Sequence, residues 1–271
     1  MIKSVLSYLN NATRRGGENM VLEIFSRREQ KYLITRAQYE MLVEQMSPYM
    51  RYDKFGNEGK YTVTSLYFEN QNHAIYFETK NKLRFRQKLR LRIYDDTDIN
   101  GLAFFEVKQK HKNVVNKRRT AIPLMDAYSY INKPTDDLEQ NYAASNYQIL
   151  KEIHHFRKLY QLEPEMVVSY DRHAFHCITD PDLRVTFDLN LRCRNEDLNI
   201  EYGPYGDNFI DPNLVVLEVK VTDSVPLWLV RILQDLECEQ RSASKFCTSL
   251  ELLKGNTLPG TQQEKILIGA I

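Results

Sequence analysis

The sequence predicts an α+β fold built on one large antiparallel β-sheet. Two observations support this prediction. About eight segments alternate polar and apolar residues or are rich in β-branched and aromatic residues, which is typical of strands. Several of these segments are joined by connections as short as residues 110–114, so neighbouring strands must run antiparallel. Eight strands are enough to close into a β-barrel with the helices packed outside, and closure removes exposed sheet edges.

The first half of the chain is expected to form five strands, over residues 21–34, 60–69, 83–94, 102–110 and 114–123. Two short helices lie between them, over residues 36–46 and 72–79. Thr35 and Asn70 stand at the N-cap positions of these helices, and Pro48 follows the end of the first. The polar residues 49–59 form a loop.

The second half begins with a helical insert over residues 124–160. Its best helix covers residues 147–160, where Ile149, Ile153, Phe156 and Tyr160 recur at helical spacing. Three more strands are expected over residues 165–175, 183–189 and 214–221, with a loop over residues 193–211. Helices over residues 227–236 and 245–253 complete a domain that spans residues 21–254. Residues 1–20 are expected to form a lead outside the core, and residues 255–271 a tail.

One strand shows the alternation in its most regular form. Between Leu83 and Tyr94 a cation occupies every second position, at Arg84, Arg86, Lys88, Arg90 and Arg92. Successive side chains of a strand point to opposite faces, so one face carries five cations and the other is apolar apart from Gln87. A solvated basic face is the simplest interpretation. Because adjacent like charges repel, the row also indicates a bound polyanion or carboxylates on neighbouring strands.

Charge and cysteine content exclude several classes of protein. Lys and Arg number 37 against 36 Asp and Glu, a net charge of +1, so the chain is not a general polycation for nucleic acid. Four cysteines without CxxC spacing indicate free thiols in a reducing compartment. No window approaches about 18 consecutive apolar residues, and the first residues lack the apolar core of a signal peptide. We therefore expect a cytoplasmic protein with no transmembrane segment.

Six of the predicted strands place charged residues at alternate positions on one face. Their twelve cations are Arg27, Lys31, the five of the basic strand, Lys108, Lys117, Arg119, Arg184 and Lys220. Their four anions are Glu29, Glu106, Asp188 and Glu218. If the sheet closes, these charges face the lumen, and the surplus of cations requires an anion because unpaired buried charges are costly. An open sheet with a solvated charged face is the alternative.

A cationic tunnel that contains a minority of carboxylates suits phosphate chemistry. Arg binds phosphate oxygens through a bidentate fork, and Lys binds them as a point charge. Carboxylates hold Mg²⁺ or Mn²⁺, which bridges phosphate oxygens and stabilises charge during phosphoryl transfer. The chain contains no GxxxxGK[ST] sequence, so it is not a P-loop enzyme.

Nine short motifs, in order and at sensible spacing, resemble the VTC domain. They are Arg27-x-Glu29-x-Lys31-Tyr32, Ser65-Leu66-Tyr67-Phe68, Leu89-Arg90-Leu91-Arg92-x-Tyr94, Glu106-x-Lys108, Lys117-Arg118-Arg119, Tyr170-x-Arg172-x-Ala174-Phe175, Leu183-Arg184-Val185-Thr186-x-Asp188, Leu217-Glu218-Val219-Lys220 and Ser244-Lys245-Phe246. The VTC domain is the polyphosphate polymerase branch of the CYTH-like triphosphate tunnel metalloenzymes, and the resemblance covers residues 21–253. It implies an eight-stranded antiparallel tunnel. This tunnel would take a nucleoside triphosphate, transfer its γ-phosphate to a growing polyphosphate chain, and use Mn²⁺ or Mg²⁺.

The resemblance also assigns roles to residues. The catalytic phosphate ligands are expected to be Lys31, Arg90, Arg92, Lys108, Arg172, Arg184, Lys220 and Lys245. Further phosphate-binding residues are Arg27, Lys117, Arg119, Tyr170 and Ser244. The metal carboxylate is expected to be Glu218, with Glu29 and Glu106 as helpers.

Some basic positions depart from the family pattern. Arg84, Arg86 and Lys88 match no motif, so we expect them at the tunnel mouth or in solvent. Family members often carry a further basic residue just before Ser244, where this chain has Ser242 and Ala243. This departure from the family pattern falls at the C-terminal end of the predicted phosphate track.

Three functions are compatible with these residues. The first is a polyphosphate polymerase that uses ATP, and the second is a triphosphatase that gives the phosphoryl group to water. These reactions share a loose transition state and most of the site, so residue types do not separate them. The third is a non-catalytic module that binds polyphosphate or a nucleotide, and the three glutamates argue against it because anion binding needs no carboxylates. Any membrane anchor would come from a partner protein.

Overall fold

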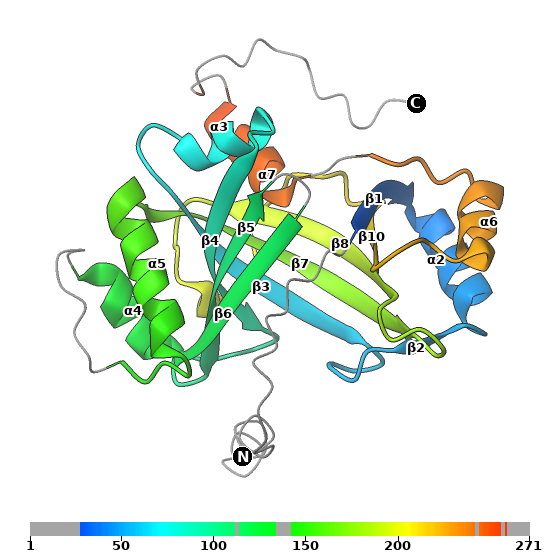
Figure 1. The fold of residues 1–271 in the computed structure, drawn as a ribbon, viewed down its shortest axis with the longest axis horizontal. Helices are drawn as coiled ribbons and strands as arrows, with labels where there is room; N and C mark the ends of the chain where they lie inside the picture. The colour runs from blue at the N-terminus through cyan, green and yellow to red at the C-terminus, as the bar shows by residue number, and fades with distance from the viewer. Residues whose placement is uncertain (1–27, 112–113, 134–141, 242–243, 256–257, 259–271) are drawn as a thin grey trace.

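The computed structural model describes residues 28–111, 114–133, 142–241, 244–255 and 258. These residues form six helices and a sheet in which all neighbouring strands are antiparallel, which confirms the predicted α+β class (Figure 1). The helices are α2 (Arg36–Met46), α3 (Ala74–Lys80), α4 (Leu124–Asn132), α5 (Tyr147–Tyr160), α6 (Leu227–Asp235) and α7 (Lys245–Lys254).

Eight long strands make up the main path of the sheet. They are β1 (Arg28–Thr35), β3 (Lys60–Glu69), β4 (Phe85–Tyr94), β5 (Leu102–His111), β6 (Val114–Pro123), β7 (Glu163–Cys177), β8 (Arg184–Arg194) and β10 (Leu214–Val221). Their spatial order is β1-β10-β8-β7-β3-β4-β5-β6. Two short strands lie off this path, where β2 (Met50–Tyr52) pairs with β7 and β9 (Asp207–Asn208) pairs with β8. No backbone pairing joins β1 to β6 within the described residues, so closure into a barrel is not detected.

The sheet is nevertheless strongly curled. Lys108 lies on β5 and Glu29 on β1, six strand positions apart in the sheet order. In a flat sheet these strands would lie about 29 Å apart, because neighbouring strands are spaced by about 4.8 Å. The Lys108 Nζ atom is only 3.6 Å from the Glu29 Oε2 atom. The face that carries both side chains is therefore the concave, inner face of the sheet.

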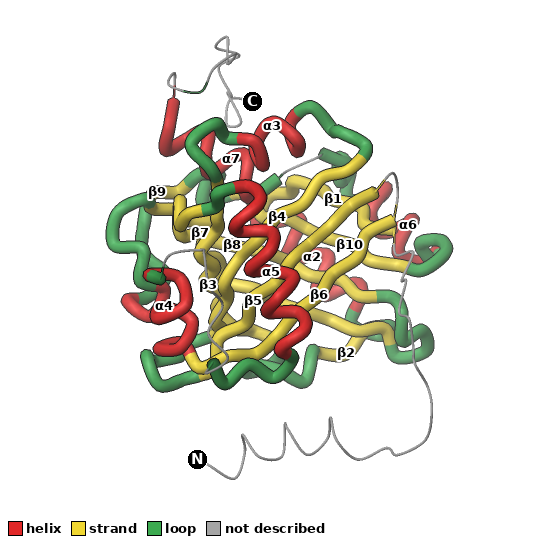
Figure 2. Tube along the Cα trace, turned by 60° about the vertical axis from the view of Figure 1, so that its left-hand side comes forward, coloured by secondary structure: helices red, strands yellow, loops and turns green. Residues whose placement is uncertain are grey.

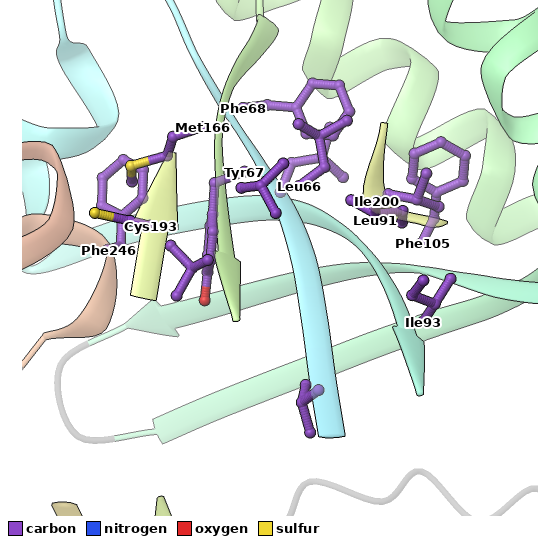
Figure 3. Close-up of a cluster of buried hydrophobic side chains, with 14 of the residues drawn as sticks. Leu66, Tyr67, Phe68, Leu91, Ile93, Phe105, Met166, Cys193, Ile200 and Phe246 are labelled. Atoms are coloured by element: carbon purple, nitrogen blue, oxygen red, sulfur yellow. The ribbon is translucent and has the colours of Figure 1, made fainter. Parts of the chain in front are cut away.

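The outer face is apolar and covered by helices. On β4 the residues that alternate with the cations, Leu89, Leu91 and Ile93, are at most 2% exposed. One buried cluster lies between α4, α5 and the strands β3 to β7, and Figure 3 shows part of it around Phe68 and Phe105. Helix α5 crosses the outer side of β5 and β6 (Figure 2). Each buried apolar side chain of this kind stabilises the fold by about 1.5–3 kcal/mol, so the outer face holds the sheet in shape.

A second buried cluster covers the other end of the sheet. Helices α2 and α6 contribute Leu42, Met46 and Leu229, which pack with apolar residues of β1, β8 and β10. The predicted N-cap of α2 is confirmed, because the Thr35 Oγ1 atom accepts the Gln38 backbone N–H at 3.2 Å and the Gln38 side chain returns the bond. This capping box satisfies backbone donors that the first helical turn leaves without partners.

Two segments that were predicted as loops contain secondary structure. Residues 49–59, predicted as a loop, contain β2, and residues 193–211 contain a 3-10 helix and β9. The second loop has no periodic sequence pattern, because its backbone is held in place by the buried side chain of one arginine. Arg194 donates to the carbonyl oxygens of Asp197, Asn199, Gly203 and Tyr205 at 2.8–3.0 Å. The part of the first strand predicted over residues 21–27, with Arg27, lies outside the described residues.

Helix α3 begins later than predicted. Asn70 does act near its start, since its Oδ1 atom accepts the Ala74 N–H at 3.0 Å. The buried Glu69 carboxylate supplies the remaining acceptors, for the N–H groups of Ile75 and Tyr76 at 3.0 and 2.8 Å. The positive end of the helix dipole also stabilises a carboxylate at this position. None of the helices in the described part of the chain is long and apolar enough to cross a membrane.

Candidate functional site

Charged side chains from seven strands and one helix meet on the inner face of the sheet. They meet there because successive side chains of a strand point to opposite faces, and each strand turns its charged set of alternate residues inward. Two carboxylates, Glu106 and Glu218, each gather several cations. We call them, with their cationic partners, the Glu106 centre and the Glu218 centre. The predicted site residues lie on the strands and helix that surround them, apart from Ser244, which caps the helix, and Arg27, which lies outside the described residues.

The Glu106 centre is built from β4, β5 and β6. The Arg90 Nε and Nη2 atoms lie 2.7 and 2.6 Å from Glu106 Oε2, and Lys117 Nζ lies 2.5 Å from Oε1. Arg92 and Arg119 approach the same carboxylate at 3.8 Å. Glu106 is 1% exposed, and burial by itself raises its pKa. The cations outweigh burial and hold the pKa of Glu106 well below its usual value, so this carboxylate stays ionised.

The Glu218 centre is built from β1, β8, β10 and α7. The Glu218 Oε1 atom accepts hydrogen bonds from Lys31 and Lys245 at 3.0 and 3.1 Å, and Oε2 accepts one from Lys220 at 3.0 Å. Lys245 also lies 2.6 Å from Asp188 Oδ2 on the adjacent strand β8. Burial raises the pKa of Glu218, but the three lysines lower it further than burial raises it.

Asp188 belongs to the Glu218 centre although it was not among the predicted site residues. It is fully buried and binds Arg172 through two bonds, at 2.6 and 2.8 Å. A bidentate pair of this kind is strong and fixes the guanidinium plane. Asp188 therefore orients Arg172 on the inner face, where its remaining donors are available to an anion.

Glu29 links the two ends of the curled sheet. It lies 3.1 Å from Lys31 on its own strand and 3.6 Å from Lys108 on β5. Burial and the nearby Glu218 both raise the pKa of Glu29, yet Lys31 and Lys108 outweigh them and lower it to about 2. This carboxylate is therefore ionised at every pH at which the protein is used.

Three lysines stand directly opposite one another across three neighbouring strands. Lys88 on β4 is in register with Lys108 on β5, which is in register with Lys117 on β6. Like charges directly opposite are destabilising. Burial lowers the pKa of Lys88 to about 8 and that of Lys117 to about 7, and neighbouring cations add to the shift. A bound anion would stabilise the charged form of these lysines further, beyond the contacts of Lys117 with Glu106 and of Lys108 with Glu29.

Lys88 lies closer to the site than the sequence suggested. Its Nζ atom donates to the Ser244 Oγ atom at 3.2 Å and lies 4.9 Å from the centre of the Phe246 ring. Ser244 caps α7 through the Cys247 N–H at 3.4 Å. Lys88 thus joins the basic strand to the helix that carries Lys245.

Comparisons with known proteins identify the family of this chain. The family model described as "VTC domain" matches residues 26–254. The chain belongs to the VTC domain family. A curated relative from Trypanosoma brucei brucei, "Vacuolar transporter chaperone complex subunit 4", is 23% identical over 95% of this chain and 39% of its own length. The protein of the same name from Trypanosoma cruzi is 25% identical over 66% of this chain and 27% of its own length. This chain therefore spans well under half the length of the curated relatives it matches.

A solved structure is also similar. It is titled "Structure of PH1819 protein from Pyrococcus Horikoshii OT3", with 13% identity, a TM-score of 0.42, and coverage of 84% of this chain and 99% of that one.

Residues that sequence reasoning missed hold the arginines of this VTC domain in place. Tyr67 accepts a hydrogen bond from Arg90 at 3.2 Å, and Ser65 accepts one from Arg92 at 3.0 Å. Both belong to a motif quoted for the resemblance, and their polar groups beside the apolar Leu66 and Phe68 are the signal that could have revealed them. Burial raises the pKa of Tyr67, and Arg90 and Arg92 outweigh it and lower the pKa to about 8.

Arg184 lies further along the VTC domain and has partners of its own. Its Nη2 atom donates to Asp53 Oδ2 at 2.7 Å and to the Tyr61 hydroxyl at 3.1 Å. Asp53 comes from the loop that follows β2, which carries no periodic pattern, so no sequence signal pointed to it. The pair leaves Arg184 about one-third exposed, and its free donors can still reach an anion.

The VTC domain offers a divalent cation few ligands of its own. Among the described residues, no group of three or more His, Cys, Asp or Glu side chains could hold a metal ion. Glu218 and Asp188 flank Lys245 from adjacent strands, and their oxygens are the hard ligands that Mg²⁺ and Mn²⁺ prefer. Mg²⁺ is usually bound by one or two carboxylates together with substrate phosphates and water. The residues therefore fit a cation that arrives with a phosphate ligand.

Proposed function

We propose that this VTC domain is a metal-dependent polyphosphate polymerase that transfers the γ-phosphate of ATP to a polyphosphate chain. One observation carries the proposal. The inner face combines rows of cations long enough for several phosphate groups with buried, ionised carboxylates beside them. The cations suit a chain of phosphates, and the carboxylates suit a metal that assists phosphoryl transfer.

The arginines are the groups that would orient the phosphate chain. Arg92 is buried and Arg90 and Arg172 are largely buried, and each is held by a carboxylate, a hydroxyl or both. Such preorganised donors stabilise charge on the transferred group without rearranging during the reaction. Lys31, Lys108, Lys220 and Lys245 would neutralise further phosphate oxygens. Glu218 would hold Mn²⁺ or Mg²⁺, with Asp188 beside it and Glu29 near, and this cation would neutralise charge on the phosphates.

The proposal also includes a closed tunnel. The Lys108–Glu29 contact supports it, since it brings the two ends of the sheet within reach of each other's side chains. A closed inner face would exclude water, which strengthens charge interactions and would direct the phosphoryl group to a phosphate acceptor rather than to water. The triphosphatase reaction is the alternative if water enters at the point of transfer.

The names of the relatives supply the proposed partners. The trypanosome proteins are named as subunits of a complex. We propose that this domain also works with partner subunits, in the cytoplasm, and that one of them associates it with a membrane. Its four cysteines are unpaired, as a reducing compartment requires.

The test is incubation of the folded protein with ATP and Mn²⁺, followed by separation of the products on a gel that resolves polyphosphate. Long polyphosphate chains are the expected product. Release of orthophosphate without polyphosphate would replace the polymerase by a triphosphatase. If neither product forms while ATP still binds, the domain is a binding module and both catalytic functions are wrong.

A further inference from the structure

Lys245 occupies a position between two carboxylates. Its Nζ atom lies 2.6 Å from Asp188 Oδ2 and 3.1 Å from Glu218 Oε1, and the side chain is 9% exposed. The two carboxylates beside it favour the charged form of the side chain, so the group is an ammonium ion. A cation held between carboxylates of adjacent strands stands where a divalent metal would stand.

The carboxylate oxygens of Glu218 and Asp188 all have cationic partners. The second oxygen of Glu218 accepts Lys220, and its first oxygen is shared between Lys31 and Lys245. Both oxygens of Asp188 accept Arg172. A metal ion between Asp188 and Glu218 would take the place of the Lys245 ammonium group, so this group would have to move first.

Lys245 is the ammonium group best placed to leave. It is the first residue of α7, whereas Lys31 and Lys220 project from paired strands. The rest of α7 is held independently, because Glu251 accepts hydrogen bonds from Tyr76 and Lys80 of α3 at 2.8 Å, and Lys254 pairs with Glu165. The long lysine side chain can therefore swing while the helix stays in place. A lysine is a point charge without a fixed fork, so little geometry is lost when it changes partner.

We propose that Lys245 acts as an internal substitute for the divalent cation, which enters between Asp188 and Glu218 only when a phosphate chain draws the Lys245 ammonium away. The proposal rests on the proposed function for the identity of the phosphate ligand. It adds an order of events: the metal binds together with the phosphate chain and not to the free protein.

The charges of the cluster favour this order. Five cations, Lys31, Lys108, Arg172, Lys220 and Lys245, surround three carboxylates, Glu29, Asp188 and Glu218. The cluster is already positive, so it repels a bare divalent cation, and the repulsion is strong in a buried site. A phosphate chain reverses the balance because it adds several negative charges. Its oxygens would accept Lys245 and complete the coordination of the metal at the same time.

The wild-type protein gives the first test. Mn²⁺ is titrated into the full chain with and without tripolyphosphate, and the water-proton relaxation enhancement reports Mn²⁺ attached to the slowly tumbling protein. A protein-free titration subtracts the Mn²⁺ that tripolyphosphate binds in solution. The expected result is at least tenfold tighter attachment of Mn²⁺ when tripolyphosphate is present. Equal attachment with and without tripolyphosphate would overturn the proposal.

Two lysine variants of the same helix give the second test. Lys245→Met keeps most of the volume of the side chain but removes the charge, so this variant should bind Mn²⁺ at least tenfold more tightly than the wild type without tripolyphosphate. Lys254→Met is the matched control, because Lys254 lies at the other end of α7 and pairs with Glu165. Its Mn²⁺ binding should equal that of the wild type.

The double variant Lys245→Met/Glu218→Gln locates the gained affinity. It should lose the Mn²⁺ binding that Lys245→Met alone acquires. If Lys245→Met folds, as its circular dichroism and unfolding curve report, and gains no Mn²⁺ affinity, Lys245 does not exclude the metal. If the double variant keeps the gain, the metal binds elsewhere and the proposal is wrong. These readouts do not involve turnover, so they remain decisive even if the ATP experiment yields no polyphosphate.

Discussion

The Glu106 and Glu218 centres both surround a buried carboxylate with cations, but they use different cations. Around Glu106 three of the four partners are arginines, Arg90, Arg92 and Arg119, and all four project from strands β4 and β6. Around Glu218 the direct partners are lysines, and one of them comes from helix α7. The first centre is therefore held mainly by planar guanidinium groups from strands of one part of the sheet. The second is held by lysine ammonium groups from two strands and a helix.

This difference indicates different tasks. The guanidinium groups of Arg90 and Arg92 also donate hydrogen bonds to Tyr67, Ser65 and Tyr170, so they keep one orientation. Fixed guanidinium groups suit a surface that aligns phosphate groups. Lysines exchange partners easily, which suits a position where a cation and a phosphate chain must enter and leave. The comparison predicts that Glu106 contributes mainly to stability and Glu218 mainly to turnover.

The largest expected effect is on stability at the Glu106 centre. Glu106→Gln leaves Arg90, Arg92 and Lys117 gathered around a neutral amide, so we expect the free energy of unfolding to fall by about 3–5 kcal/mol. Glu218→Gln should cost roughly half as much, because Lys245 keeps its contact with Asp188 and the flexible side chains of Lys31 and Lys220 can turn to solvent. Urea unfolding measures both. Equal losses in the two variants would remove the distinction between the centres.

The second effect is on turnover at the Glu218 centre. Glu218→Gln should abolish formation of product from ATP, since the carboxylate that would hold the metal is lost. ATP binding should largely persist because the arginines are untouched, and isothermal titration calorimetry measures it. Unchanged turnover would remove Glu218 from the metal role.

A third effect concerns the affinity of the inner face for a phosphate chain. Arg90→Ala should weaken tripolyphosphate binding by roughly tenfold to a hundredfold, because hydrogen bonds between charged partners contribute about 1.5–3 kcal/mol. Arg84→Ala is the matched control, since Arg84 is an exposed residue of the same alternating row and precedes β4. Fluorescence or calorimetric titration compares the two variants. If their affinities are the same, the inner part of the basic strand does not line the site.

The smallest effect is a pH dependence. Burial lowers the pKa of Lys88 to about 8 in the free protein, and a bound phosphate chain would raise it again. Binding then takes up a proton above pH 8, so affinity should fall as the pH rises from 7 to 9. Lys88→Arg keeps its charge throughout this range and should flatten the profile, while titration of the ligand affects both proteins equally. Parallel profiles for the two proteins would show that Lys88 does not contact the phosphate chain.

Much of the site could be predicted from the sequence because strand periodicity is simple. Alternation alone placed Arg90, Glu106 and Glu218 on one face, and the inner-face contacts bear this out. What alternation cannot reveal is which strands become neighbours. The pairing of β1 with β10, which brings Lys31 to Glu218, joins segments far apart in the chain.

Other parts of the site had no pattern to reveal them. Asp53 contacts Arg184 from an irregular loop, and the role of Lys245 between two carboxylates depends on how α7 docks. Lys88 matched no family motif, yet the hydrogen bond to Ser244 brings it to the site. These residues act through tertiary contacts, which no local periodicity records.

The place of β1 in the sheet has a consequence for how the chain folds. Lys31 and Glu218 are separated by 187 residues, and the other edge of β1 meets Gln240 and Arg241, which come later still. At about 5–20 residues per second, a ribosome needs roughly 10–40 s to make the intervening chain. During that time the first strand has no partner, and contacts between such distant segments also form slowly. The Glu218 centre is therefore the last part of this protein to assemble, and a nascent chain that stalls before β10 leaves its first strand open to aggregation.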